Sequence, residues 1–359
     1  MIGYITRRVL VSIPVLFGIL LVTFVLARLI PGDPCKAILG EKATVETCER
    51  FTKLHGLDQP IYVQFGLYIT RVLQGDFGNS IRFSRPVSQI LVERLPMTIE
   101  LAIGGLVLAI LVGVPLGILS AMRHNTSVDV ATMIFANVGI SMPVFWLGLM
   151  LAYVFALMLK GTWLWLPPSG RLSAGLTSTP FYEAWGWTVM AGTAKAKLLE
   201  FVANHYIFNA LITGDWTTFK DAVRHLILPV VALSTISMAI IARMTRSSLL
   251  DVLGRDYVRT ARAKGAKEPR VVGRHALRNA LLPVVTILGL QMGGLLGGAV
   301  LTETVFGLAG VGRMLFEAIT ARDYPIIQAF TVVIAVAYMM INLIVDVSYG
   351  FLDPRIRLE

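Results

Sequence analysis

The sequence predicts an all-α integral membrane protein with about six transmembrane helices and two long external loops. Of its 359 residues, 55% are hydrophobic and only 15% are charged, whereas soluble domains carry about a quarter charged residues. The apolar residues also stand in long uncharged runs, not in the amphipathic stripes of soluble helices. This composition is therefore typical of a protein whose helices lie in lipid.

Six uncharged runs have roughly the length that a membrane-crossing helix needs. A helix rises about 1.5 Å per residue, so about 20 residues cross the ~30 Å hydrocarbon layer. The third run contains Pro143, which predicts a kink or tilt, and the fourth is short unless it extends past Arg243. The runs are 9–27, 101–122, 130–159, 226–242, 280–302 and 326–345.

Two segments invite a different interpretation. The run 9–27 follows two arginines, as a signal peptide does, but it is longer than a usual signal core, so we interpret 1–30 as a retained transmembrane helix. The segment 198–213 contains four polar residues whose burial in lipid costs free energy. We therefore expect it to be an external or interfacial helix. The remaining chain divides into an external region 31–98, a membrane core 99–352 and a tail 353–359.

Basic residues indicate the orientation, because Lys and Arg are enriched in cytoplasmic connections. The short connection 303–325 on one side has only Arg313 and Arg322. We expect both termini in the cytoplasm and the loops 31–98 and 160–225 outside, and the net charge of +10 then requires no nucleic-acid partner. The opposite side holds Arg7, Arg8, Arg123, ten basic residues between 243 and 278, Arg355 and Arg357.

Cys35 and Cys48 are the only cysteines and both fall in the first external loop. In an oxidising compartment two cysteines thirteen positions apart can form a disulfide. Two unpaired thiols remain the alternative, because spacing does not prove geometry. Further ligands of the usual zinc pattern are missing nearby, so no metal site is predicted.

The connection 243–279 is the most basic part of the chain. Its stretch 256–264 lacks Gly and Pro, with Asp256 near the start and Gly265 just past the end, which predicts a short cytoplasmic helix. On composition alone, a solvated basic loop lying against anionic lipid headgroups is an equal alternative.

The stretches Tyr257–Gly265 and Arg274–Pro283 resemble the ATPase-contacting loop of ABC importer permeases, and more narrowly that of the dipeptide/oligopeptide permease family. The general importer pattern is Glu-Ala-Ala, three residues, Gly, and later Leu-Pro. Here Arg259 and Thr260 replace the Glu and the first Ala, while Ala261 and Gly265 keep their spacing. The Leu-Pro lies later than in the general pattern, as expected for the peptide branch.

Further stretches in the same order extend the resemblance over nearly the whole chain. They are Ile30–Pro34, Gly75–Gly78 with Ser80, Ser141–Pro143 with Phe145 and Trp146, Arg243–Ser248, Thr302–Phe306, Arg322–Pro325 and Asp353–Arg357.

This resemblance implies a type I ABC importer permease fold in a prokaryotic inner membrane. It implies a second homologous permease subunit, two cytoplasmic ATPase subunits and an extracytoplasmic solute-binding protein as partners. ATP and Mg would be bound by the ATPases, and this chain would be a transport subunit without a cofactor and not an enzyme. The residues that the resemblance assigns to the coupling helix are Tyr257, Arg259, Thr260, Ala261, Ala263 and Gly265.

Other functions fit the sequence less well. A phosphate-binding P-loop needs Gly-Lys, a dipeptide that does not occur in this chain. An ion-coupled secondary transporter usually has acids deep in the bilayer, whereas Asp346 stands at the end of the sixth run and is interpreted as the partner of a nearby arginine. The five scattered histidines match no hydrolase motif. Peptides are the favoured substrate, with nickel chelates and oligosaccharides as alternatives.

The translocation path has four candidate residues: Asn137, Ser141, Gln291 and Gly294. Gly294 belongs to a group of five glycines in the fifth run, and small residues allow helix backbones to approach closely. Either these glycines pack within the subunit, or their helix lines the pore or the contact with the second permease. The sequence leaves both interpretations open.

Overall fold

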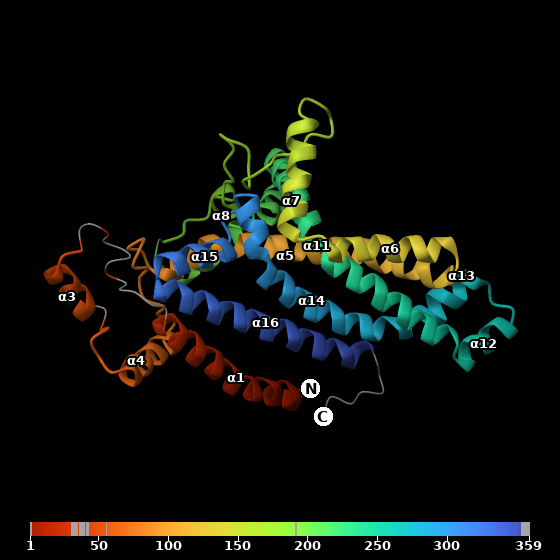
Figure 1. Ribbon diagram of the computed structural model, residues 1–359, viewed down its shortest axis with the longest axis horizontal. Helices are drawn as coiled ribbons and strands as arrows, with labels where there is room; N and C mark the ends of the chain where they lie inside the picture. Colours follow the sequence, from red (N-terminus) through yellow and green to blue (C-terminus); the bar gives the residue numbers. More distant parts are fainter. Residues whose placement is uncertain are drawn as a thin grey trace.

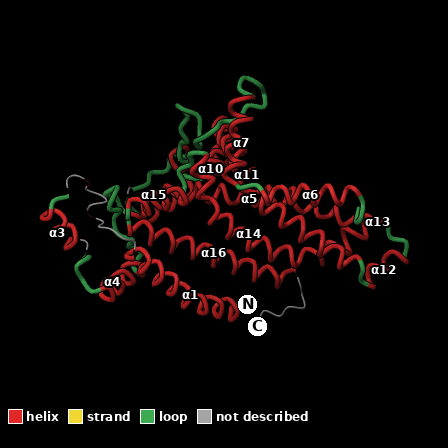
Figure 2. The backbone as a smooth tube through the Cα atoms, viewed as in Figure 1, coloured by secondary structure: helices red, strands yellow, loops and turns green. Residues whose placement is uncertain are grey.

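Most of the residues that the structure describes fold into helices (Figure 1). The structure is a computed structural model, and it describes residues 2–29, 35, 40, 43–54, 56–190 and 192–352. Figure 2 shows no strand in these residues, and their only strand-like pairing is an isolated bridge between Asn79 and Pro86. The motifs at 30–34 and 353–357 and the tail 353–359 lie outside the described residues. The predicted all-α class is confirmed.

The long helices form one elongated bundle (Figure 1). Among the described residues, five helices are long and apolar enough to cross a membrane, and a bent pair brings the number to six when it is counted as one span. The five are α1 (Ile2–Leu29), α5 (Val87–Met122), α11 (Trp216–Leu253), α14 (Leu277–Val305) and α16 (Tyr324–Leu352). The bent pair is α6 (Ser127–Ser141) with α7 (Val144–Ala152) and the π-helical η2 (Tyr153–Met158).

The third predicted run bends at Pro143. The chain turns by 98° between α6 and the segment formed by α7 and η2. Met142 is extended, with φ −82° and ψ 126°, because a proline ring disfavours the helical conformation of the residue before it. The predicted kink is confirmed, and its size carries α7 steeply away from the bundle (Figure 1).

Helix α11 is the centre of the bundle, where it packs against both α5 and α14. Close contact with α5 depends on two glycines. A Cβ at Gly113 would lie 2.7 Å from the carbonyl oxygen of Met238, and a Cβ at Gly117 would lie 2.5 Å from that of Ala242. Glycine therefore allows the two backbones to touch.

Two helices are longer than their apolar runs. Helix α5 begins at Val87, inside the expected external loop, and α11 covers 38 residues where the run 226–242 was predicted. Asp215 caps α11 by accepting from the backbone N–H of Thr218 at 3.0 Å. An uncharged run marks only the part of a helix suited to lipid, whereas caps and propensity decide where the helix ends.

Shorter helices occupy the two ends of the bundle. The predicted surface segment 198–213 is confirmed as non-spanning, since it breaks into α9 (Ala194–Ala203) and α10 (Tyr206–Thr213). At one end lie α3 (Val45–Leu54), α4 (Ile61–Leu73), α8 (Phe181–Ala184) and α15 (Val311–Ala321), and at the other α12 (Asp256–Ala263), α13 (Glu268–Arg270) and the π-helical η3 (Val271–Ala276) (Figure 1). We call the second end the α12 end.

Candidate functional site

Helix α12 is the predicted short helix, and the structure confirms it at Asp256–Ala263. It follows α11 directly and stands at the end of the bundle (Figure 1). Its Val258 side chain is fully buried in a small core with Ala121 of α5, Leu249 of α11 and Val271 of η3. The helix is therefore seated on the ends of three other helices.

A hydrogen bond joins α12 to the start of α14. The Asn279 side-chain amide donates to the Tyr257 hydroxyl at 2.7 Å. The two residues come from the two stretches that resemble the ATPase-contacting loop, 22 positions apart. Between them lies η3, one turn of π-helix, an irregularity that is frequent at functional sites.

Gly265 ends the helix in the left-handed region, with φ +78°. Its N–H donates to the carbonyl of Arg262 at 2.9 Å, and the N–H of Ala266 donates to that of Ala261 at 3.3 Å. These bonds satisfy carbonyls that a helix end leaves without partners. The structure thus confirms the predicted position of Gly265 just past the end of the helix.

The six predicted coupling residues differ in exposure. Ala261 is partly buried and packs against the core around Val258. Its side chain therefore helps to hold the helix against the rest of the chain. Gly265 is exposed beyond the last helical turn, so the two residues do not form one exposed face. The other five, Tyr257, Arg259, Thr260, Ala263 and Gly265, are exposed.

Ion pairs order the connection without neutralising it. Arg262 bonds the Glu268 carboxylate at 2.6 Å, and hydrogen bonding to that carboxylate raises the pKa of the Arg262 guanidinium. Arg259 approaches Asp256 at 3.6 Å, with both side chains mostly in solvent, where such pairs contribute little. Arg274 and Arg278 are exposed and make no ion pair within the described part of the chain. The surface around α12 remains basic.

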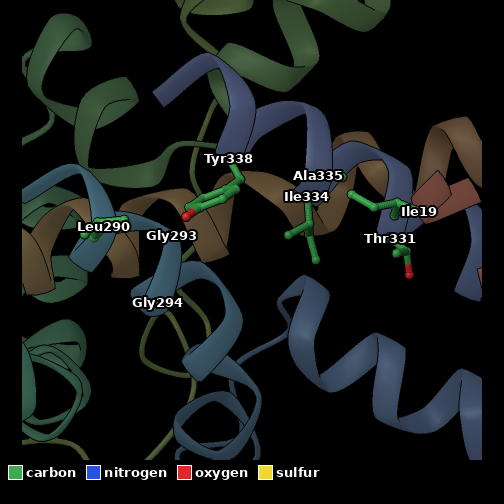
Figure 3. A pocket seen from close by; sticks show the side chains of 8 residues that line it. All are labelled: Ile19, Leu290, Gly293, Gly294, Thr331, Ile334, Ala335 and Tyr338. Atoms are coloured by element: carbon green, nitrogen blue, oxygen red, sulfur yellow. The ribbon is translucent and has the colours of Figure 1, made fainter. Parts of the chain in front are cut away.

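The four candidate path residues do not lie together. Asn137 lines a hollow between α6 and α11, and Ser141 is exposed one turn further along α6. Gln291 lies inside the bundle, where its side-chain oxygen accepts from the Ser237 hydroxyl at 2.8 Å. Gly294 lines a separate apolar hollow between α1, α14 and α16 (Figure 3).

The glycines of α14 divide between two surfaces. A Cβ at Gly289 would lie 2.5 Å from Val345, and one at Gly293 would lie 2.1 Å from the ring of Tyr338, so both pack tightly against α16. Gly294 and Gly297 have no such neighbour within 4 Å. Figure 3 shows the Tyr338 ring beside Gly293. The interpretation that the glycines pack within the subunit therefore holds for Gly289 and Gly293, whereas the face of α14 with Gly294 and Gly297 is open.

Buried charges are the feature that sequence reasoning missed. Arg246 of α11 bonds both oxygens of Asp129 at 2.7 and 2.8 Å, and Asp129 is almost fully buried. Asp129 escaped notice because it bounds the uncharged run 130–159. Glu303 is fully buried and accepts from the hydroxyl of Thr98 and the N–H of Arg313. Its stretch was recognised by resemblance, but nothing in it indicated a partner 205 residues away.

Two predicted contacts near the bundle ends can be compared with the structure. Asp346 pairs with Arg8 at 2.7 Å, which confirms that an arginine is its partner. Cys35 and Cys48 are joined by a disulfide with their Cα atoms 5.5 Å apart. No group of three or more His, Cys, Asp or Glu residues suited to a metal ion occurs among the described residues.

Comparison with known proteins places the chain in a family. Residues 113–358 match the family described as binding-protein-dependent transport system inner membrane component, and residues 1–102 match the N-terminal region described for the same systems. The dipeptide transport system permease protein DppB of Alkalihalophilus pseudofirmus is 44% identical over 357 residues, covering 99% of this chain and 100% of that protein.

Two other relatives agree along their full lengths. The dipeptide transport system permease protein DppB of Escherichia coli K12 is 41% identical, with 99% of each chain covered. The oligopeptide transport system permease protein AppB of Bacillus subtilis is 39% identical, covering 99% of this chain and 100% of that protein. The chain therefore belongs to the family of inner membrane components of binding-protein-dependent transport systems, as a multi-pass transport subunit and not an enzyme.

Proposed function

We propose that this chain is the pore-forming permease subunit of an ATP-driven importer of di- or oligopeptides. The observation that carries the proposal is the placement of α12. This exposed helix follows α11 in sequence and is bonded to α14 through Tyr257 and Asn279. A force on α12 therefore reaches two central helices at once, as a coupling element requires.

The proposed partners follow from this arrangement. Two ATPase subunits, which hold ATP and Mg, dock on α12, and their closure moves α11 and α14. The exposed basic residues near α12 favour an acidic docking surface on the ATPases. A second homologous permease completes the pore, and an extracytoplasmic solute-binding protein delivers the substrate. Both termini and α12 then face the cytoplasm of a prokaryotic cell.

The substrate class is inferred from the relatives. Proteins named as dipeptide and oligopeptide permeases match this chain along its full length, which favours peptides over nickel chelates and oligosaccharides. An ion-coupled secondary transporter is disfavoured because Asp346, the acid that the sequence analysis considered for such a role, is paired with Arg8.

Reconstitution of the complete importer in proteoliposomes tests the proposal. We expect ATP-dependent uptake of labelled di- and tripeptides that requires the binding protein and both permeases. Uptake of a nickel chelate or an oligosaccharide at a higher rate would overturn the substrate assignment. Uptake driven by an ion gradient without ATP would overturn the importer mechanism.

A further inference from the structure

A hollow of about 470 Å³ lies between α6 and α11, toward the α12 end. Its ends are polar and its middle is apolar. Asp129 and Arg246 lie at one end and Asn137 at the other, with Val130, Met133 and Ile134 between them. No described part of this chain fills it.

Arg246 retains hydrogen-bonding capacity toward this hollow. Its Nε and Nη2 groups donate to Asp129. Asp129 also accepts from the Ser120 hydroxyl and from the backbone N–H of Asn125, so its oxygens are well supplied with donors. The Nη1 group of Arg246 has no partner in the described chain, and a guanidinium has five N–H donors in a fixed fork. Because Arg246 lines the hollow, a carboxylate that enters the hollow is within reach of this guanidinium.

Asn137 indicates that the hollow does not face lipid tails. Its side chain is exposed and makes no hydrogen bond within the described residues. Val130, Ile134, Asn137 and Ser141 follow one another at helical spacing on the outer face of α6, and Ser141 is exposed as well. An unsatisfied amide in the middle of a span costs free energy in hydrocarbon. This face of α6 therefore suits water or a polar solute.

We propose that the hollow is a contact site for the peptide on its way through the membrane. Arg246 receives the terminal carboxylate of the peptide through Nη1, and the Asn137 amide bonds a peptide group. The apolar middle accommodates side chains. This inference rests on the proposed function, because the hollow becomes part of a pore wall only in the assembled importer.

The dimensions of the hollow suit a short peptide. Eight positions separate Asp129, the partner of Arg246, from Asn137, which is about 12 Å along a helix. An extended peptide covers about 3.3–3.6 Å per residue, so roughly three residues fit between the two polar ends.

Cysteine labelling in the assembled importer tests the exposure of the site. The chain has only two cysteines, which are joined to each other, so Asn137→Cys introduces a single free thiol. Phe135→Cys is the matched control, because Phe135 is 57% exposed but lies on another side of α6. In inside-out vesicles we expect a membrane-impermeant thiol reagent to modify the Asn137→Cys variant about tenfold faster than the Phe135→Cys variant. Equal rates at the two positions would overturn the proposal.

Protection of the same thiol by peptides tests whether the site binds a terminal carboxylate. A tripeptide with a free carboxylate should slow the labelling at position 137, and the same tripeptide with an amidated C-terminus should do so about tenfold less well. Equal protection by both peptides would overturn the role of Arg246. This comparison leaves Arg246 in place and needs neither the binding protein nor ATP.

A double variant that removes both charges distinguishes a direct contact between Arg246 and the peptide from a purely structural role of Arg246. Arg246→Gln alone leaves the buried Asp129 without its charged partner, whereas Arg246→Gln with Asp129→Asn removes both charges. In the double variant the preference for the free carboxylate should disappear while labelling at 137 persists. A preserved preference would show that Arg246 only supports Asp129. Uptake by the wild-type importer is measured in parallel, and its failure would count against the proposed function instead.

Discussion

The Tyr257 hydroxyl accepts a hydrogen bond from the Asn279 amide at 2.7 Å and thereby connects α12 to α14. The two residues lie on either side of η3 and belong to separate stretches of the sequence. At the α12 end, α11 therefore leads directly into α12, and the hydrogen bond connects α12 to α14. In the proposed mechanism, motion imposed on α12 reaches α11 at one end of this helix and α14 through the hydrogen bond.

Tyr257→Phe tests this connection, because it keeps the ring and removes only the hydroxyl. A hydrogen bond contributes about 0.5–1.5 kcal/mol net, which corresponds to roughly two- to tenfold. We expect peptide-stimulated ATPase activity of the reconstituted importer to fall by this factor, while the ATPases still co-purify. Tyr62→Phe is the control, since Tyr62 is 76% exposed on α4, which lies at the opposite end of the bundle from α12 (Figure 1). Equal activity in Tyr257→Phe and wild type would contradict the connection.

Gly265→Val tests the left-handed helix end. Gly265 has φ +78° and no neighbour within 4 Å of an added Cβ, so the strain of a branched residue there is purely conformational. We expect loss of most uptake with near-normal amounts of protein in the membrane. Arg259→Glu should be milder, because exposed charge pairs contribute only about 0–1 kcal/mol. If α12 were instead a loop lying on lipid headgroups, charge reversal would be the more harmful change.

Two further variants serve as controls for this ranking. Gly265→Asn should retain more uptake than Gly265→Val, because asparagine tolerates the left-handed region. Gly273→Val places the same side chain in the same connection, where the backbone is not left-handed and space is open. Wild-type uptake by Gly265→Val would contradict the assignment. Ala261→Glu is less informative, since Ala261 packs partly against the core of its own chain.

Local signals explain what the sequence predicted correctly. Acidic and glycine boundaries located α12, and the proline at position 143 located the bend, because each acts on its own neighbourhood in the chain. The apolar runs located the spans for the same reason. They underestimated α5 and α11, because a helix that continues out of the lipid becomes polar without losing its helical hydrogen bonds.

Distant pairs could not be predicted in this way. The Ser80 hydroxyl donates to the fully buried Asp323, a contact between residues 243 positions apart. Both stretches were recognised by their resemblance to the permease family, yet neither has a local feature that indicates which residue it contacts. The pairing of Arg246 with Asp129 across 117 positions is of the same kind. Such contacts depend on the helix packing, and a single sequence does not show which faces meet.

The disulfide between Cys35 and Cys48 gives a chemical test of the region 31–98, which the sequence predicts to be an external loop. We expect mass mapping of non-reduced peptides to find the two linked, with no free thiol, in protein isolated without reductant. Loss of a crosslink that closes a loop of this size costs about 3 kcal/mol by chain entropy, so Cys35→Ser should lower the thermal stability of this region. Alkylation of both thiols in the absence of reductant would refute the disulfide.

Gly293 and Gly294 lie on different faces of α14, so we predict that the same substitution affects stability at one position and not at the other. A Cβ at Gly293 would lie 2.1 Å from the ring of Tyr338, whereas one at Gly294 would have no neighbour within 4 Å. Overpacking of a close contact costs about 1–3 kcal/mol. We therefore expect Gly293→Ala to lower the thermal stability of the isolated subunit in detergent, and Gly294→Ala to leave it unchanged.

A larger residue at position 294 then tests what covers the open face. Gly294→Leu should leave the isolated subunit stable, because the added side chain enters the hollow lined by Leu290 and Ile334 (Figure 3). If the second permease packs on this face, the same variant should reduce co-purification of the two permeases, since small residues allow the close approach of helices. Retained assembly with Gly294→Leu would show that lipid covers this face. Equal stability of Gly293→Ala and Gly294→Ala would contradict the packing of α14 on α16 itself.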